Sequence, residues 1–129
     1  MVREKPLILI VDDDKPIVYM FSEKLKNSGF DVAVAYNGKE GWERAEREKP
    51  DAMLLDLRMP FMNGIEVLEK LKKNQDTKDI PVIILSSFND WSPMKLELQT
   101  AKNLGVADFA EKGIDLNDLV RRLKTLLKI

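Results

Sequence analysis

The chain of 129 residues contains no cysteine and no histidine. Without cysteine it can form neither a disulfide, nor a thiolate nucleophile, nor a cysteine-ligated metal site. Without histidine it lacks the commonest metal ligand and the usual general base, and it has no imidazole that could itself carry a phosphoryl group. Any chemistry of this chain must therefore depend on oxygen ligands, hydroxyl groups and amines.

The chain also lacks a strong net charge and a long apolar segment. Its 21 basic and 22 acidic side chains leave a formal net charge of −1, so no broad basic field indicates nucleic acid or an anionic membrane as a partner. The apolar run at residues 7–11 is too short to span a bilayer, and nothing resembles a signal peptide. We therefore expect a soluble cytoplasmic protein made of one domain, residues 1–129.

Strand-like and helix-like patterns alternate along this chain. Continuous apolar runs, typical of strands buried on both faces, occur at residues 7–11, 31–35, 52–57, 81–86 and 106–110. Helical spacing of apolar residues follows each run, with caps expected at Asp14, Gly29 and Asp115. The fourth helix, within residues 88–104, carries Leu96, Leu98, Ala101 and Leu104. Five β-then-α units in series predict an α/β fold, a parallel sheet with helices on both faces.

Polar side chains stand at the ends of four of these runs. Asp12 and Asp13 follow the first run, Asp56 lies in the third, Ser86 ends the fourth and Lys112 follows the fifth. Because open α/β sheets build their sites at the carboxyl ends of the strands, we expect these groups to meet. Three carboxylates without histidine or thiol favour Mg²⁺ or Mn²⁺. Such an ion beside a carboxylate and a lysine is typical of phosphoryl transfer.

Each of these residues also has a simpler explanation. An acidic doublet after a strand often caps a helix, and Asp14 fits that role better than a metal role. A serine at a strand end often bonds to the backbone, and most lysines lie at the surface. Asp56 is harder to explain in this way, because a buried carboxylate without a partner is costly. The occurrence of all these residues in order, each at a strand end, favours a shared site.

The ordered motifs VDD, LLDLRMPFMNG, IILSS and FAEKG resemble those of response-regulator receiver domains in two-component signalling. The resemblance covers essentially all 129 residues. It implies a five-stranded parallel sheet of order 2-1-3-4-5 flanked by five helices. It also implies a stand-alone receiver of residues 1–129, with no output domain.

The resemblance assigns a role to each site residue. Asp56 would be the phosphoacceptor, and Ser86 and Lys112 would contact the phosphoryl group. Ser86 and Phe109 would form the switch. The metal ligands would be Asp12, Asp13, Asp56 and the backbone carbonyl of Arg58. The phosphoryl donor would be a sensor histidine kinase or a histidine phosphotransfer protein, and a downstream protein would be the target or, in a relay, the next acceptor. Such a protein is no enzyme beyond its own phosphorylation and dephosphorylation.

Four features depart from the usual family pattern. Gly113 follows Lys112 in place of proline, so we expect a trans bond and a turn made by the freedom of the glycine backbone. Phe109 lacks the hydroxyl with which a tyrosine could bond at the surface. Arg58 is a long cation that would reach the phosphoryl group or point to solvent. The stretch from Ser86 to Lys112 is about one helical turn longer than usual, and we expect Trp91 within it to report the switch.

Three alternatives remain at this point. A pseudo-receiver would keep the fold and bind partners without phosphorylation. A Mg²⁺-dependent phosphatase of the haloacid-dehalogenase class would also use an aspartyl phosphate, but Arg58 occupies the place of its second aspartate. Asp12 and Asp14 have that spacing, but the chain has no room for a substrate cap domain. A flavodoxin-like electron carrier would share the fold, but the acidic cluster would repel a flavin phosphate.

Overall fold

The computed structural model describes residues 3–87 and 95–129, in which five strands alternate with five helices. The strands are β1 (Leu7–Val11), β2 (Asp31–Ala35), β3 (Ala52–Asp56), β4 (Val82–Ser86) and β5 (Asp108–Glu111). The helices are α1 (Lys15–Asn27), α2 (Gly38–Glu48), α3 (Gly64–Lys73), α4 (Lys95–Asn103) and α5 (Leu116–Leu127). The predicted order of elements is confirmed, with limits that differ by one or two residues. The prediction for Trp91 lies outside the described residues.

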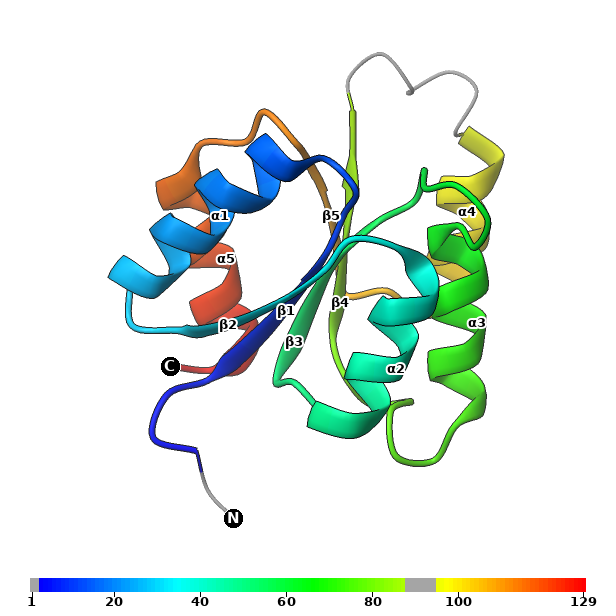
Figure 1. Ribbon diagram of the computed structural model, residues 1–129, viewed down its shortest axis with the longest axis horizontal. Coiled ribbons are helices and arrows are strands. Elements are labelled where there is room, and N and C mark those ends of the chain that lie inside the picture. The colour runs from blue at the N-terminus through cyan, green and yellow to red at the C-terminus, as the bar shows by residue number, and fades with distance from the viewer. Residues whose placement is uncertain (1–2, 88–94) are drawn as a thin grey trace.

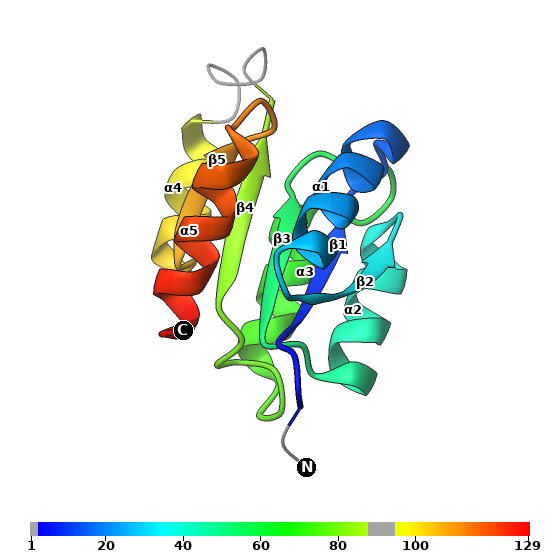
Figure 2. The same ribbon diagram turned by 90° about the vertical axis from the view of Figure 1, so that its left-hand side faces the viewer.

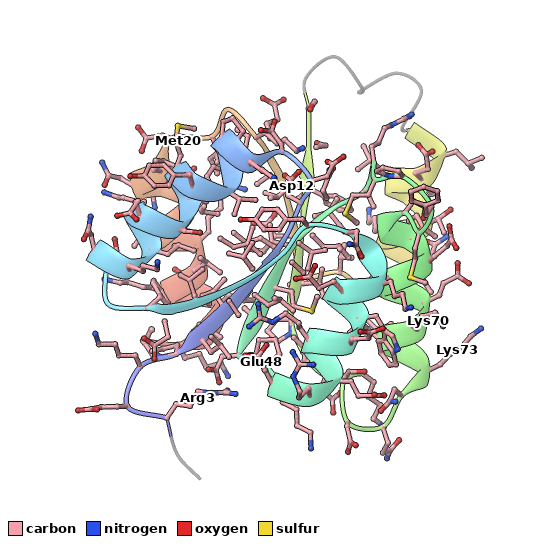
Figure 3. The ribbon with its side chains drawn as sticks, in the orientation of Figure 1. Arg3, Asp12, Met20, Glu48, Lys70 and Lys73 are labelled. Carbon is pink, nitrogen blue, oxygen red and sulfur yellow. The ribbon has the colours of Figure 1, made fainter. Side chains whose placement is uncertain are left out.

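The strands form one parallel sheet in the order β2-β1-β3-β4-β5, which confirms the predicted topology. In its register Val11 lies opposite Leu55, Asp56 opposite Leu85, and Ser86 opposite Glu111. Because all strands run in the same direction, their carboxyl ends share one edge of the sheet. Figure 3 shows Asp12 at this edge, where β1 gives way to α1.

Helices cover both faces of the sheet. Figures 1 and 2 show α1 and α5 on one face and α2, α3 and α4 on the other. The first face packs Phe21, Leu25, Leu119 and Leu123 against Ile8, Ile10, Leu54 and Ile83. The second packs Ala45, Val67, Leu68 and Ala101 against Leu9, Val11, Leu55 and Ile84. The central strands are therefore apolar on both faces, which explains their continuous apolar runs.

Side-chain caps set the helix ends that the sequence predicted. Asp14 accepts a hydrogen bond from the Ile17 N–H at 3.2 Å, and Asp115 accepts two at the start of α5. Gly29 has φ +96° after α1, the left-handed conformation that glycine adopts without strain. At α3, Asn63 and Glu66 cap each other's backbone N–H groups, a reciprocal box that the sequence analysis did not predict.

Helix α4 turns one of its predicted apolar residues outward. Leu98 and Leu104 pack against the apolar core between the sheet and α2, α3 and α4, called the second core below, and Ala101 is buried in it. Leu96, by contrast, is 77% exposed. Residues two positions apart lie on nearly opposite sides of a helix, so Leu96 and Leu98 cannot both face the sheet. Among the described residues, no helix has the length and apolar character needed to cross a membrane.

Candidate functional site

Three carboxylates meet at the carboxyl edge of the sheet. Asp12 and Asp13 follow β1 and Asp56 ends β3, and these two strands are neighbours in register. Each residue offers one oxygen, and the three oxygens lie within 4.8 Å of one another. Asp12 is fully buried, Asp56 is 3% exposed and Asp13 is exposed. The predicted acidic cluster is thus brought together by the fold.

One ammonium group serves both buried carboxylates. Lys112 Nζ donates to Asp12 Oδ1 at 3.0 Å and to Asp56 Oδ2 at 3.2 Å. The lysine, just beyond β5, is held in place because its backbone N–H donates to the Ser86 carbonyl at the end of β4 at 2.8 Å. When both buried carboxylates are ionised, two negative charges face one positive charge, and the exposed Asp13 adds a third negative charge at the rim. The cluster keeps a negative excess that a further cation would offset.

Backbone groups complete part of the hydrogen bonding of the cluster. The Asp14 N–H donates to Asp12 Oδ1 at 3.0 Å, and the Arg58 N–H donates to Asp56 Oδ1 at 3.1 Å. Asp12 Oδ2 is buried and has no hydrogen-bond partner among the described residues. It lies 3.0 Å from Lys112 Nζ, so it shares with Asp56 the positive charge of one ammonium. A bound cation would bring a further positive charge to this buried oxygen.

The donor set fits a hard divalent cation. It consists of carboxylate oxygens, with the Arg58 carbonyl nearby in sequence, and contains no nitrogen or sulfur ligand. The three carboxylate oxygens lie within 4.8 Å of one another, close enough to bind one such ion together. An all-oxygen ligand set of this kind suits Mg²⁺ or Mn²⁺.

Burial and like charge perturb the acceptor candidate. Burial raises the pKa of Asp56 to about 7, the charge of Asp12 adds to this effect, and Lys112 and the Arg58 N–H oppose it. Burial alone would lower the pKa of Lys112, but the charges of Asp56 and Asp12 outweigh it and the pKa is raised. Lys112 is therefore protonated at neutral pH, whereas metal-free Asp56 is near its titration midpoint.

Ser86 lies on β4, next to the acceptor strand β3, and Phe109 lies on β5, one strand further away. Ser86 is 2% exposed at the end of β4, and Phe109 in β5 packs in part against the second core. Both residues line a hollow of about 300 Å³ beside β5, together with Ala110, Glu111, Ile114 and Arg122. The Arg122 guanidinium donates to the Phe109 carbonyl at 3.0 Å. The coupled movement of Ser86 and Phe109 stays a prediction.

The loop after Asp56 differs from expectation at Arg58. The sequence offered the phosphoryl group or solvent as partners for this side chain, but its guanidinium lies 3.4 Å from Glu97 Oε2 in α4. Nothing in the sequence indicated this contact, because Glu97 lies 39 positions away on a helix surface. At the start of α3, Gly64 packs so closely on the Asp56 carbonyl that a Cβ would overlap it. The Asn63-Gly64 pair suggested a loop but not this close packing.

Gly113 does not use the freedom that the sequence analysis expected of it. The peptide bond after Lys112 is trans, as predicted. However, the φ of Gly113 is outside the left-handed region, and an added Cβ would meet no atom within 4 Å. The expectation of a glycine-dependent turn is therefore wrong, because this backbone conformation is open to other residues.

Comparison with known proteins agrees with this geometry. The family model described as the response regulator receiver domain matches residues 8–124. Protein PilH of Pseudomonas aeruginosa is 33% identical over 120 residues, which cover 93% of this chain and 96% of PilH. Transcriptional regulatory protein PrrA of Mycobacterium bovis is 34% identical over 123 residues, 95% of this chain and 50% of PrrA. The chain spans about half the length of PrrA and of the other transcriptional regulators it matches.

Solved structures give the same result. The CheY-like receiver domain protein of Methanospirillum hungatei superposes with a TM-score of 0.87 at 27% identity, covering 97% of this chain and 95% of that one. The receiver domain of Francisella response regulator 1452 has a TM-score of 0.82 at 32% identity, covering 96% and 98%. With this fold, this acidic cluster and a family match over nearly its whole length, the chain belongs to the response regulator receiver domain family.

Proposed function

We propose that this receiver domain takes a phosphoryl group onto Asp56 from a phosphohistidine of a partner protein, with Mg²⁺ or Mn²⁺ bound, and changes a protein-interaction surface in response. One observation carries the proposal: a single lysine ammonium bridges two buried carboxylates, and the carboxylate of Asp13 lies beside them. A purely structural ion pair would balance its charges, whereas three carboxylates around one ammonium leave an excess of negative charge that a cation would offset.

The residues of the chain have separate roles in the transfer. An Asp56 carboxylate oxygen forms the new bond to phosphorus, the bond from phosphorus to the histidine nitrogen breaks, and the imidazole leaves with that electron pair. Lys112, already within hydrogen-bond distance of Asp56, offsets the charge on the phosphoryl oxygens. The Ser86 hydroxyl donates a hydrogen bond to the same group. Backbone N–H groups, of which that of Arg58 already bonds to Asp56, orient the carboxylate.

The divalent cation would be held by Asp12, Asp13, Asp56 and the Arg58 carbonyl. Once bound, it would neutralise the acids and the developing charge on the phosphoryl group. Metal binding and nucleophilic attack both need the carboxylate form of Asp56, whose pKa near 7 leaves part of it protonated in the metal-free protein. Cation and ammonium thus favour the same reactive form.

The partners follow from what the chain contains. Residues 1–129 contain no histidine, so the phosphohistidine lies outside this domain, in a sensor histidine kinase or a histidine phosphotransfer protein. Such partners act in the cytoplasm, and we place this protein there. Its activity would be limited to its own phosphorylation and dephosphorylation. The chain 1–129 would act as a stand-alone receiver with a downstream protein as target, with PilH as a relative of similar length.

A small phosphodonor tests this proposal without the cognate kinase. The protein is incubated with acetyl phosphate and Mg²⁺, and its intact mass is measured. We expect one added phosphoryl group with Mg²⁺ and none with a chelator. Equal labelling in the presence of the chelator would contradict the metal requirement. No labelling at all would favour a pseudo-receiver that binds partners without phosphorylation.

A further inference from the structure

Arg58 contacts the acceptor and the fourth helix at the same time. Its backbone N–H donates to Asp56 Oδ1 at 3.1 Å, and its guanidinium donates to Glu97 Oε2 at 3.4 Å. Figure 1 shows the loop between β3 and α3, which carries Arg58, beside the N-terminal end of α4. One residue is therefore connected both to the proposed phosphorylation site and to a helix far from it in sequence.

The Arg58–Glu97 ion pair bridges an open groove. The groove measures about 350 Å³ and is lined by Leu57, Arg58, Met59, Pro60, Asn63 and Glu97. Within the described part of the chain, no other side-chain hydrogen bond or ion pair joins α4 to the remaining elements. Its other anchors are apolar, chiefly Leu98 and Ala101 on the second core. The ion pair is thus a polar tether at the N-terminal half of α4.

We propose that Glu97 is a positioning residue, which holds the Arg58 guanidinium away from Asp56 until a phosphoryl group takes that guanidinium over and releases α4. This step rests on the proposed function, because the competing anion is the acyl phosphate of Asp56. A phosphoryl group carries more negative charge than a carboxylate, and its oxygens match the guanidinium fork. The exchange makes and breaks ion pairs only, and no covalent bond changes.

The Arg58–Glu97 ion pair is weak enough to be broken by a competing anion. Arg58 and Glu97 are 43% and 44% exposed, so water screens their attraction. Ion pairs at such positions contribute little to folding, but they shift a two-state equilibrium by up to about fivefold. The phosphoryl group would contact Arg58 only in the state in which Arg58 has left Glu97 and α4 is released. This difference in contacts between the two states is what a population shift requires.

Amide hydrogen exchange of α4, residues 95–103, measured on the full chain, tests whether Arg58 leaves Glu97 for the phosphoryl group. The probe is beryllofluoride with Mg²⁺, a mimic of the acyl phosphate. In the wild type we expect the mimic to accelerate exchange in α4. In Glu97→Gln we expect fast exchange without the mimic and up to about fivefold tighter beryllofluoride binding, because Arg58 is free. Glu43→Gln, which removes an exposed carboxylate from the Lys39–Glu43 pair on α2, should behave as the wild type does.

A charge-swapped variant distinguishes the proposed change of ion-pair partner from an ion pair that is merely structural. Arg58→Glu combined with Glu97→Arg restores two opposite charges across the groove but leaves no guanidinium at position 58. We expect α4 to be protected in this variant and to stay protected when beryllofluoride binds. If the pair served only to hold α4 in place, the swapped variant would release α4 as the wild type does, and that result would overturn the proposal.

The remaining outcomes are equally decisive. If Glu97→Gln shows the same hydrogen exchange in α4 and the same affinity for beryllofluoride as the wild type, the role of Glu97 is refuted. The proposed function of the domain would not be affected by that result. A wild type that neither binds beryllofluoride nor accepts a phosphoryl group from acetyl phosphate would refute the proposed function, and the exchange of partners with it.

Discussion

Lys112 Nζ lies 3.2 Å from Asp56 Oδ2, although the two residues are 56 positions apart in the chain. Three parallel strands create this contact, because β3 ends in Asp56, β5 ends next to Lys112, and β4 lies between them. The Ser86 carbonyl at the end of β4 accepts the Lys112 N–H and fixes the lysine at this edge. The perturbed pKa values of Asp56 and Lys112 follow from this arrangement.

The metal-free protein should lose stability as the pH rises from about 4 to about 7. The pKa of Asp56 is about 7 in the folded protein and near 4 in the unfolded chain, so the folded state binds more protons between these values. Asp56→Asn removes this titration. At pH 8 with a chelator we expect the variant to be more stable than the wild type by a few kcal/mol, in urea unfolding. Parallel pH profiles of the two proteins would contradict the burial argument.

Lys112→Met should raise the pKa of Asp56 above about 7. The substitution keeps the length of the side chain but removes the charge that lowers this pKa, while burial and the charge of Asp12 remain. NMR titration of the Asp56 carboxyl carbon measures the shift, and labelling by acetyl phosphate should be slower. Lys39→Met, at an exposed lysine of α2, serves as the control. An unchanged Asp56 titration would indicate that the ammonium does not act on the acceptor.

Asp14 and Asp13 should respond in opposite ways to substitution. Asp14→Ala removes the N-cap of α1 and should cost about 1 kcal/mol of stability, with little change in Mg²⁺ affinity. Asp13→Ala should weaken Mg²⁺ binding but raise the stability of the metal-free protein slightly, because it relieves repulsion among the acids. Urea unfolding and calorimetric Mg²⁺ titration measure both. Loss of stability in metal-free Asp13→Ala would make Asp13 a structural residue.

Alanine at two glycines should shift stability in opposite directions. Gly113→Ala meets no atom and no backbone strain, so it should stabilise the protein by about 0.4–1 kcal/mol by restricting the unfolded chain. Gly105 has φ +85°, and its Cβ would approach only Lys72 Nζ at 3.9 Å. Gly105→Ala should therefore destabilise by about 1 kcal/mol through the backbone alone. Thermal unfolding measures the stability of the two variants. Equal changes in stability would contradict a left-handed φ at Gly105 and an ordinary φ at Gly113.

The fold was predictable because its signals are local and consistent. The apolar runs of β1, β3 and β4 are long enough to indicate burial on both faces, and caps such as Asp14 and Asp115 mark the helix ends. The alternation of the elements then leaves few arrangements other than a parallel sheet. Because parallel strands align their carboxyl ends, the meeting of Asp12 and Asp56 followed from the order of elements alone.

The remaining features depend on side-chain positions that no local pattern encodes. The Arg58–Glu97 pair joins a loop to a helix surface, where either side chain has other partners within reach. Phe61, fully exposed with φ +68°, adopts a backbone conformation that is rare for a bulky residue. The pKa of Asp56 depends on burial and on Asp12, which are known only once the strands are placed. The sequence therefore predicts which groups meet but not how their charges balance.

The site of phosphorylation tests the central claim most directly. Wild type, Asp56→Asn and Asp76→Asn, an exposed aspartate that serves as the matched control, are incubated with acetyl phosphate and Mg²⁺ and their intact masses are compared. We predict one phosphoryl group on the wild type and on Asp76→Asn, and none on Asp56→Asn, because the amide oxygen is a poor nucleophile. Labelling of Asp56→Asn to the level of the wild type would contradict the assignment of Asp56 as the phosphoacceptor.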